Sequence, residues 1–205
     1  MVEGNKLDRV AILISHLLNP ALVAFAVFGV GGWLLGGNWV AALIGVGFYA
    51  VLPGLTLHLL LRLGYIGELY PPEQRQRARL LLLGALSYLL GFIGLGLIGA
   101  PGFMLGGGLA YFINALLVWQ INKYWKISIH SVAVSGGVLI ILVAAGKHAW
   151  PLVLAWPLVA WARLHIKVHT PAQVVAGALL GVSSTGLLLF LTNWFCNSGD
   201  LYNIR

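Results

Sequence analysis

The sequence predicts an all-α integral membrane protein, a bundle of about six to seven transmembrane helices. Of its 205 residues, 60% are hydrophobic and only 8% are charged, which excludes the surface of an ordinary soluble domain. The mean hydropathy is +0.94. Apolar runs follow one another at about the 20-residue length that crosses the hydrocarbon core. No internal repeat, low-complexity tract or linker separates them, so residues 1–205 are predicted to form a single multi-pass domain.

The first apolar segment, residues 10–33, directly follows a charged stretch and has no cleavage site, so we expect it to be retained. Asn19 and Pro20 interrupt it, which predicts a broken helix or two shorter pieces. Small residues such as Gly177 and Gly181 are expected to let helices approach closely in lipid. The helices that follow the first segment are predicted at 39–61, 80–99, 102–122, 129–146, 149–163 and 171–194.

The predicted helix 149–163 is the shortest and contains Pro151 and Pro157. Proline in a helix interior removes a backbone donor and clashes with the preceding turn. We therefore expect this segment to be tilted, kinked or only partly spanning.

The lysine and arginine residues are distributed asymmetrically about the predicted spans. An odd number of spans places the N-terminus and the loops 62–79, 123–128 and 164–170 on one side of the membrane. Ten of the twelve Lys and Arg residues lie on that side, and only Lys147 and Arg205 lie on the other. The positive-inside rule predicts that the basic side is cytoplasmic. Residues that bind a phosphate would also gather on one side, so a binding site is an alternative cause of the asymmetry.

The composition also limits the partners and cofactors. A formal net charge of +7 could suggest a nucleic-acid binder, but no basic face of a soluble fold is present to carry that function. The single cysteine, Cys196, supplies neither a disulfide framework nor a metal cluster. The predicted partners are therefore the bilayer and a lipid or prenyl phosphate, with assembly as a homo-oligomer or as a subunit of a membrane complex left open. No metal or other cofactor is expected.

A polar cluster stands between the last two apolar segments. A charged group at such a place needs a partner or an aqueous cavity, so the cluster is a candidate site. Thr170 can cap the helix that follows, Pro171 suits its first position, and Gln173 completes a capping box. His169 then stands directly before a helix N-terminus, where backbone N–H groups favour an anion such as phosphate. The cluster holds two cations and two histidines: Arg163, His165, Lys167 and His169.

Cations from three separate loops are expected to meet on the basic side. A phosphoryl group needs several fixed positive donors, and the guanidinium of arginine supplies them in a planar fork. His130 and His169 can divide the acid–base work, because one imidazole can attack while the other donates a proton to the leaving oxygen. The sequence therefore predicts metal-free phosphoryl chemistry through histidine. The expected phosphate ligands in these loops are Arg75, Arg77, Lys126 and Arg163.

Two stretches of the chain resemble motifs of the PAP2 superfamily, the type 2 phosphatidic acid phosphatases. The stretches are residues 125–130, WKISIH, and the pattern Arg163-x5-His169-x3-Gln173, and the resemblance extends over a core of about 62–194. It implies that His169 is the nucleophile that becomes phosphohistidine and that His130 is the general acid. It also implies that Ser128 and Arg163 bind phosphate.

The chain departs from the motifs of that family at several positions. Ala162 precedes Arg163 where the family has serine, Ile129 replaces a glycine before His130, and the first motif survives only as a cluster of arginines. Gln173 stands where the family has aspartate. A glutamine carbonyl can accept the same hydrogen bond from the ring of His169, but it brings no charge.

Three functions are compatible with these observations. The first is a membrane phosphatase that hydrolyses a lipid phosphate or prenyl diphosphate. The second is a catalytically silent relative that acts as a lipid-binding or structural subunit. The third, a transporter, fits the broken first segment but lacks an acidic residue within a span to couple an ion. The phosphatase predicts that Arg77, Lys126, His130, Arg163 and His169 converge in one pocket.

Overall fold

The computed structural model describes residues 5–67 and 74–200, and these residues form helices without strands, as expected for an all-α membrane protein. By length and composition, five helices in this part of the chain can cross a membrane. The number rises to six when the bent pair at the N-terminus is counted as one span. Leucine, valine and phenylalanine side chains are exposed along the outer surface, as contact with lipid requires.

The first span is broken where the sequence predicts. The helix α1 (Lys6–Leu17) ends just before Asn19, and the chain bends by 45° before it continues to Leu34. The Asn19 side chain accepts hydrogen bonds from the N–H groups of Ala21 and Leu22, and Pro20 takes the first position of the new helix. The second part consists of α2 (Pro20–Ala24), the π-helix η1 (Phe25–Gly31) and α3 (Gly32–Leu34).

The next three spans follow the predicted order. A continuous helix from Trp39 to Arg62 includes a π-helical turn in its middle, and α6 begins before the predicted residue 80. These spans consist of α4 (Trp39–Val46), η2 (Gly47–Val51), α5 (Leu52–Arg62), α6 (Gln74–Leu97) and α7 (Gly102–Ile121).

The prediction of a helix over 149–163 needs correction. After α8 (Ile129–Ala145), Gly146 has a φ of 64° and opens a 3-10 helix, η3 (Gly146–Leu154), which contains Pro151. Proline lacks the N–H that an α-helix needs at this point, so the chain becomes α-helical again only in α9 (Ala155–His165). The last helix, α10, runs from Pro171 to Asp200, beyond the predicted residue 194.

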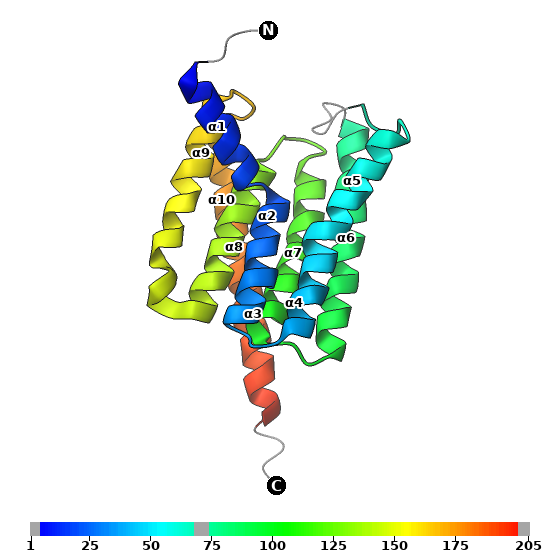
Figure 1. Cartoon of the computed structure of the whole chain (residues 1–205), viewed down its shortest axis with the longest axis vertical. Coiled ribbons are helices and arrows are strands. Elements are labelled where there is room, and N and C mark those ends of the chain that lie inside the picture. The colour runs from blue at the N-terminus through cyan, green and yellow to red at the C-terminus, as the bar shows by residue number, and fades with distance from the viewer. Residues whose placement is uncertain (1–4, 68–73, 201–205) are drawn as a thin grey trace.

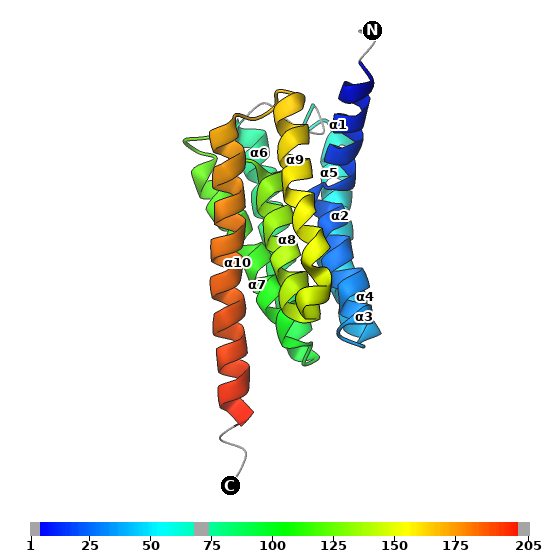
Figure 2. The ribbon, with the colours of Figure 1, turned by 90° about the vertical axis from the view of Figure 1, so that its left-hand side faces the viewer.

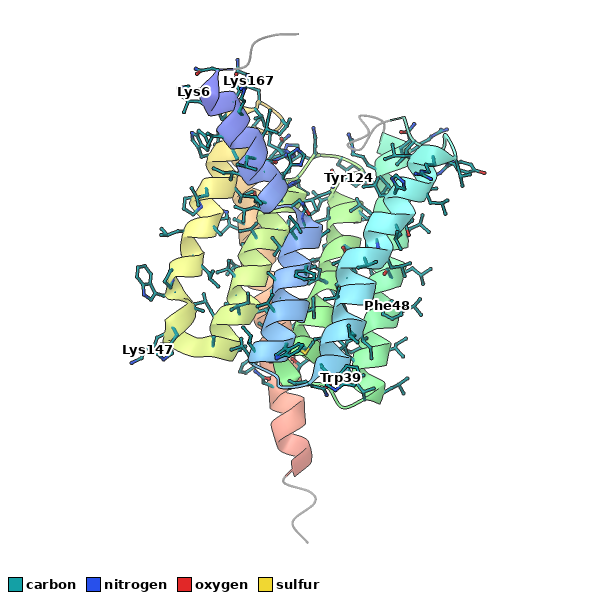
Figure 3. All side chains as sticks on the ribbon, viewed as in Figure 1. Lys6, Trp39, Phe48, Tyr124, Lys147 and Lys167 are labelled. Carbon is teal, nitrogen blue, oxygen red and sulfur yellow. The ribbon has the colours of Figure 1, made fainter. Side chains whose placement is uncertain are left out.

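The helices stand side by side along the long axis of the molecule, and the N- and C-terminal ends of the chain lie at opposite ends of the bundle (Figure 1, Figure 2). α5 ends and α6 begins at the end of the bundle where α1 begins, and the loops that connect α7 to α8 and α9 to α10 lie at the same end (Figure 1). Lys6 and Lys167 lie at this end and Lys147 at the other (Figure 3). The loops that carry the predicted site residues therefore share one end of the bundle, which we call the basic end.

Two kinds of packing hold the bundle together. Aromatic rings fill its centre, where Phe28 stacks on Tyr49 at 4.1 Å and Tyr49 stacks on Tyr88 at 5.3 Å between ring centroids. Small residues instead join α8 to α10. A Cβ atom on Gly177 would lie 2.6 Å from the Ser128 carbonyl oxygen, so only glycine permits this approach. The predicted role of Gly177 in close helix packing is confirmed, and this contact sets the two helix starts beside each other at the basic end.

Candidate functional site

The loop between α9 and α10 is held by two successive caps. α9 ends in a Schellman motif, in which the Lys167 N–H donates to the Leu164 carbonyl and the Val168 N–H donates to the Arg163 carbonyl. Lys167 takes the left-handed conformation, with a φ of 55°, at the position that glycine usually occupies. His169 directly follows Val168, the last residue of this motif, so the motif fixes the backbone on the N-terminal side of His169.

The capping box predicted at the start of α10 is present. The Gln173 N–H donates to the Thr170 hydroxyl at 3.4 Å, and the Thr170 N–H donates to Gln173 Oε1 at 3.1 Å. The same Oε1 lies 3.0 Å from His169 Nδ1. Because Oε1 already accepts from a backbone N–H, it is an oxygen and can only accept again, so Nδ1 carries the proton. Gln173 is therefore a cap and a partner of the His169 ring at once.

This arrangement leaves Nε2 of His169 as the nitrogen with a free lone pair. Burial lowers the pKa of His169 to about 4, against an opposing effect of the Gln173 hydrogen bond and with help from the nearby charges of Arg163 and Lys126. The ring is therefore neutral near pH 7. A neutral imidazole with its Nδ1 proton fixed can attack through Nε2.

Lys126 connects the loop before α8 to the loop before α10. Its Nζ donates to the Val168 carbonyl oxygen at 3.2 Å. Burial lowers the pKa of Lys126, and so do the positive charges of Arg77 and Arg163, which shows that these three cations lie close enough to interact. Lys126 thus interacts with cations of α6 and α9, and Lys126 and Arg163 also act on His169.

Arg163 and His130 lie deeper than His169. Arg163 is only 8% exposed, and its Nη1 donates to the Ser15 hydroxyl at 2.8 Å. His130 is 4% exposed, is hydrogen-bonded to the backbone of Ser15, and interacts electrostatically with Arg163 and His169. Electrostatic interactions link Arg163 to Lys126, His130 and His169, and link Arg77 to Lys126. Of the five residues that the sequence expects to converge, only Lys126 and His169 line one pocket, so their convergence around a phosphate stays a prediction.

The contribution of α1 to this cluster was not predicted. Ser15 is separated from Arg163 by 148 positions and lies outside the core that resembles the PAP2 motifs. One signal in the sequence could have indicated it, because Ser15 is a hydroxyl residue within the first apolar segment. A polar side chain at such a position generally faces another helix rather than lipid.

Ser128, an expected phosphate ligand, lies beneath the surface of the site. Its side chain caps α8 by accepting hydrogen bonds from the N–H and the hydroxyl of Ser131, and it is completely buried. The Ser128 N–H donates to the Gln173 carbonyl at 3.3 Å. These contacts make Ser128 a link between the two helix starts, and its contact with phosphate stays a prediction.

A groove of about 600 Å³ opens at His169. It is open to the outside. His130 and Arg163 are not part of its lining and are more deeply buried. The polar residues that line the groove are Lys126, Lys167, His169, Thr170 and Gln173.

Arg75, also expected among the phosphate ligands, lies in a second pocket of about 290 Å³ between α6 and α7. Trp119, Asn122 and Lys123 share this pocket. The Lys123 Nζ lies 3.6 Å from the centre of the Trp119 ring and donates to Gln120 Oε1 at 2.7 Å. Arg75 thus lines this second pocket and not the groove at His169, and its contact with phosphate stays a prediction.

The remaining polar residues near the basic end have structural contacts. His165 Nε2 lies 2.9 Å from Asp8 Oδ1, and the His165 ring stacks on Trp161 at 5.1 Å between centroids. In the part of the chain that the structure describes, no group of three or more His, Cys, Asp or Glu side chains is placed to hold a metal ion.

The chain matches no family model, no curated protein and no solved structure. We therefore infer a function from the residues at the basic end and their geometry.

Proposed function

We propose that this protein is a membrane phosphatase similar to the PAP2 enzymes, which hydrolyses a lipid phosphate or prenyl diphosphate without a metal through a phosphohistidine. One observation carries the proposal. A neutral His169 ring is held through Nδ1 by Gln173, and the positive charges of Arg163 and Lys126 act on the same ring. A nucleophilic nitrogen beside fixed cations is the arrangement that attack on a phosphoryl group requires.

The proposed reaction has two steps. In the first, Nε2 of His169 attacks phosphorus, the bond from phosphorus to the leaving oxygen breaks, and that oxygen takes a proton from His130, which enters the step as the imidazolium and leaves it as the neutral ring. In the second, a water oxygen attacks the phosphorus of the phosphohistidine and the phosphorus–nitrogen bond breaks. The proton of that water returns to His130, and the phosphate leaves.

Cations stabilise the charge that develops on the phosphoryl oxygens. The charges of Arg163 and Lys126 act on His169, and Arg77 interacts with Lys126. Lys167 lines the groove and offers a further positive charge at its rim. Donors that are already in place need no reorganisation as the transition state forms, so their effect on the rate is large.

The proposed substrate is delivered from the bilayer. The groove lies at an end of a bundle whose outer surface is apolar, where the phosphate of a lipid would stand while its chains stay in the hydrocarbon core. This placement favours an amphiphilic phosphate over a fully water-soluble one.

The test measures phosphate release by the purified protein in the presence of a metal chelator. Short-chain phosphatidic acid and a prenyl diphosphate are the substrates. We expect turnover by the wild type, no turnover by His169→Ala, and an acid-labile phosphoenzyme that only the wild type forms. His148→Ala is the matched control, because His148 lies in η3 and outside the cluster, and it should behave as the wild type does. Equal activity of wild type and His169→Ala would refute the proposal.

The role of His130 is tested with substrates that differ in their leaving group. With a leaving group that needs no proton, His130→Ala should keep part of the rate of the first step. With a leaving group that needs a proton, this rate should fall by about 100-fold or more. A loss of equal size for all leaving groups would argue against the assignment of His130 as the acid.

A second candidate function follows from Gln173. Because its amide brings no negative charge, it stabilises the imidazolium less than a carboxylate would. The alternative is therefore a protein that binds lipid phosphate at the same groove without hydrolysing it, as a subunit of a membrane complex. Phosphate binding without turnover, together with a gain of activity in Gln173→Asp, would support this alternative.

A further inference from the structure

Ser15 lies where the two buried groups of the site meet. Its hydroxyl accepts a hydrogen bond from Arg163 Nη1 at 2.8 Å, and its backbone is hydrogen-bonded to His130. Arg163 belongs to α9 and His130 to α8, so a residue of α1 contacts one group from each of two other helices. Ser15 is itself 5% exposed, which keeps water from replacing these contacts.

A second contact fixes α1 against α9. Asp8 lies seven positions before Ser15, which is about two helical turns, so both side chains lie on the same face of α1. Asp8 pairs with His165 at 2.9 Å, and His165 lies in the same last turn of α9 as Arg163. The two helices lie against each other at the basic end (Figure 1, Figure 2). The contacts of Asp8 and Ser15 with α9 thus lie two turns apart along α1, and together they hold Ser15 beside Arg163.

The direction of a buried guanidinium depends on its acceptors. The group is planar and carries five N–H donors in a rigid fork, so an acceptor on one donor sets the direction of the others. Charged groups inside a membrane bundle need such partners. The Ser15 hydroxyl is an acceptor of this kind, and it comes from α1, whereas the proposed catalytic histidines lie in α8 and in the loop between α9 and α10.

We propose that Ser15 is a positioning residue whose hydroxyl aligns the Arg163 guanidinium with a phosphoryl group bound at His169. This inference rests on the proposed function of the groove. It makes the first, bent span a part of the site and not only a part of the bundle. Ser15 acts through Arg163 and has no contact of its own with the phosphate.

The first test compares kcat/KM of three variants with that of the wild type. Ser15→Ala removes the acceptor and should lower kcat/KM by about tenfold, the effect of losing one hydrogen bond to a charged group. Ser15→Thr keeps a hydroxyl and should restore kcat/KM to within about twofold of the wild type. Ser87→Ala is the matched control. Ser87 is 4% exposed, its hydroxyl donates to the Phe48 carbonyl, and its loss should lower thermal stability without changing kcat/KM.

A double-mutant cycle separates positioning from a structural role. In an Arg163→Lys background, where the guanidinium fork is absent, Ser15→Ala should lower kcat/KM by less than about twofold. A tenfold loss in that background would overturn the inference. So would a Ser15→Ala variant that keeps kcat/KM within about twofold of the wild type and loses only thermal stability.

Binding of inorganic phosphate, measured by calorimetry on the same proteins, distinguishes failure of this inference from failure of the proposed function. If the wild type binds phosphate without turnover, the phosphatase proposal fails, and Ser15→Ala should still weaken phosphate binding by about tenfold through Arg163. Unchanged phosphate affinity in Ser15→Ala would overturn the inference whether or not the wild type is active. A wild type that neither binds phosphate nor turns over substrate would overturn both.

Discussion

The groove at His169 and the pocket at Arg75 both lie at the basic end and both are lined by cations, yet they differ in the groups that accompany the charge. In the groove, an imidazole is held neutral by burial, with its Nδ1 fixed by Gln173 and with the charge of buried Arg163 acting on it. In the pocket, Lys123 is held against Trp119 and Gln120, and the described residues that line it include no histidine or carboxylate. Both can attract an anion, but of the described linings only that of the groove contains a histidine, the residue that we propose as the nucleophile.

This difference shows why a cluster of positive charge does not by itself define a reactive site. Cations at the end of a membrane bundle attract lipid head groups wherever they stand. Chemistry requires in addition a group that can form a bond, in the correct protonation state and held in one direction. The two successive caps around His169 provide that direction from local sequence, and Arg163 with Lys126 provides the electrostatic environment.

Of the changes that test this difference between groove and pocket, Gln173→Leu is expected to have the largest effect on turnover. This change removes the acceptor of His169 Nδ1 and the capping contact to the Thr170 N–H. Turnover should fall by tenfold or more, on the order of one lost hydrogen bond in the transition state, and stability should fall by about 1 kcal/mol from the lost cap. Turnover and thermal unfolding are measured on the same preparation. A fully active Gln173→Leu protein would remove Gln173 from the site.

An intermediate effect is expected from pH. The pKa of His169 lies near 4 in the folded protein and at an ordinary value of 6.5 in the unfolded chain. Between these values the unfolded chain binds more protons, so His169 lowers stability progressively as pH falls from about 6.5 to 4. The ring stays mainly neutral over the same window, and the acid limb of kcat/KM that is due to His169 should lie near pH 4.

Gln173→Asp sharpens this prediction. A carboxylate beside Nδ1 favours the charged imidazolium, so the acid limb should move to higher pH while turnover near pH 7 is kept or raised. The control is the wild type measured in the same buffers. An acid limb that stays in place in Gln173→Asp would show that the limb belongs to another group.

The smallest effect is expected from Arg75→Ala. Because Arg75 lines the second pocket and not the groove, its loss should change kcat/KM for a short-chain substrate by less than about twofold. Arg77→Ala is the comparison. It removes a charge that interacts with Lys126 beside His169 and should lower kcat/KM by about tenfold. A loss with Arg75→Ala as large as that with Arg77→Ala would support Arg75 as a phosphate ligand and erase the contrast between the two regions.

Local sequence alone determined the fold class, the break at Asn19 and the loop around His169. A break at proline, a capping box and an i, i+4 contact from His169 to Gln173 depend on residues a few positions apart, so their geometry follows from helix rules. The same rules explain why Arg75 lines the second pocket while Arg77 interacts with Lys126, because residues two positions apart on a helix point in different directions.

Only the tertiary structure decided which distant groups complete the site. Ser15 meets Arg163 across 148 positions because α1 bends at Asn19 and lies along α9, and no periodicity in either segment indicates this contact. The 3-10 segment before α9 likewise depends on how the chain reverses at Gly146. Partners far apart in sequence are selected by helix packing, whereas caps and breaks are selected by neighbouring residues.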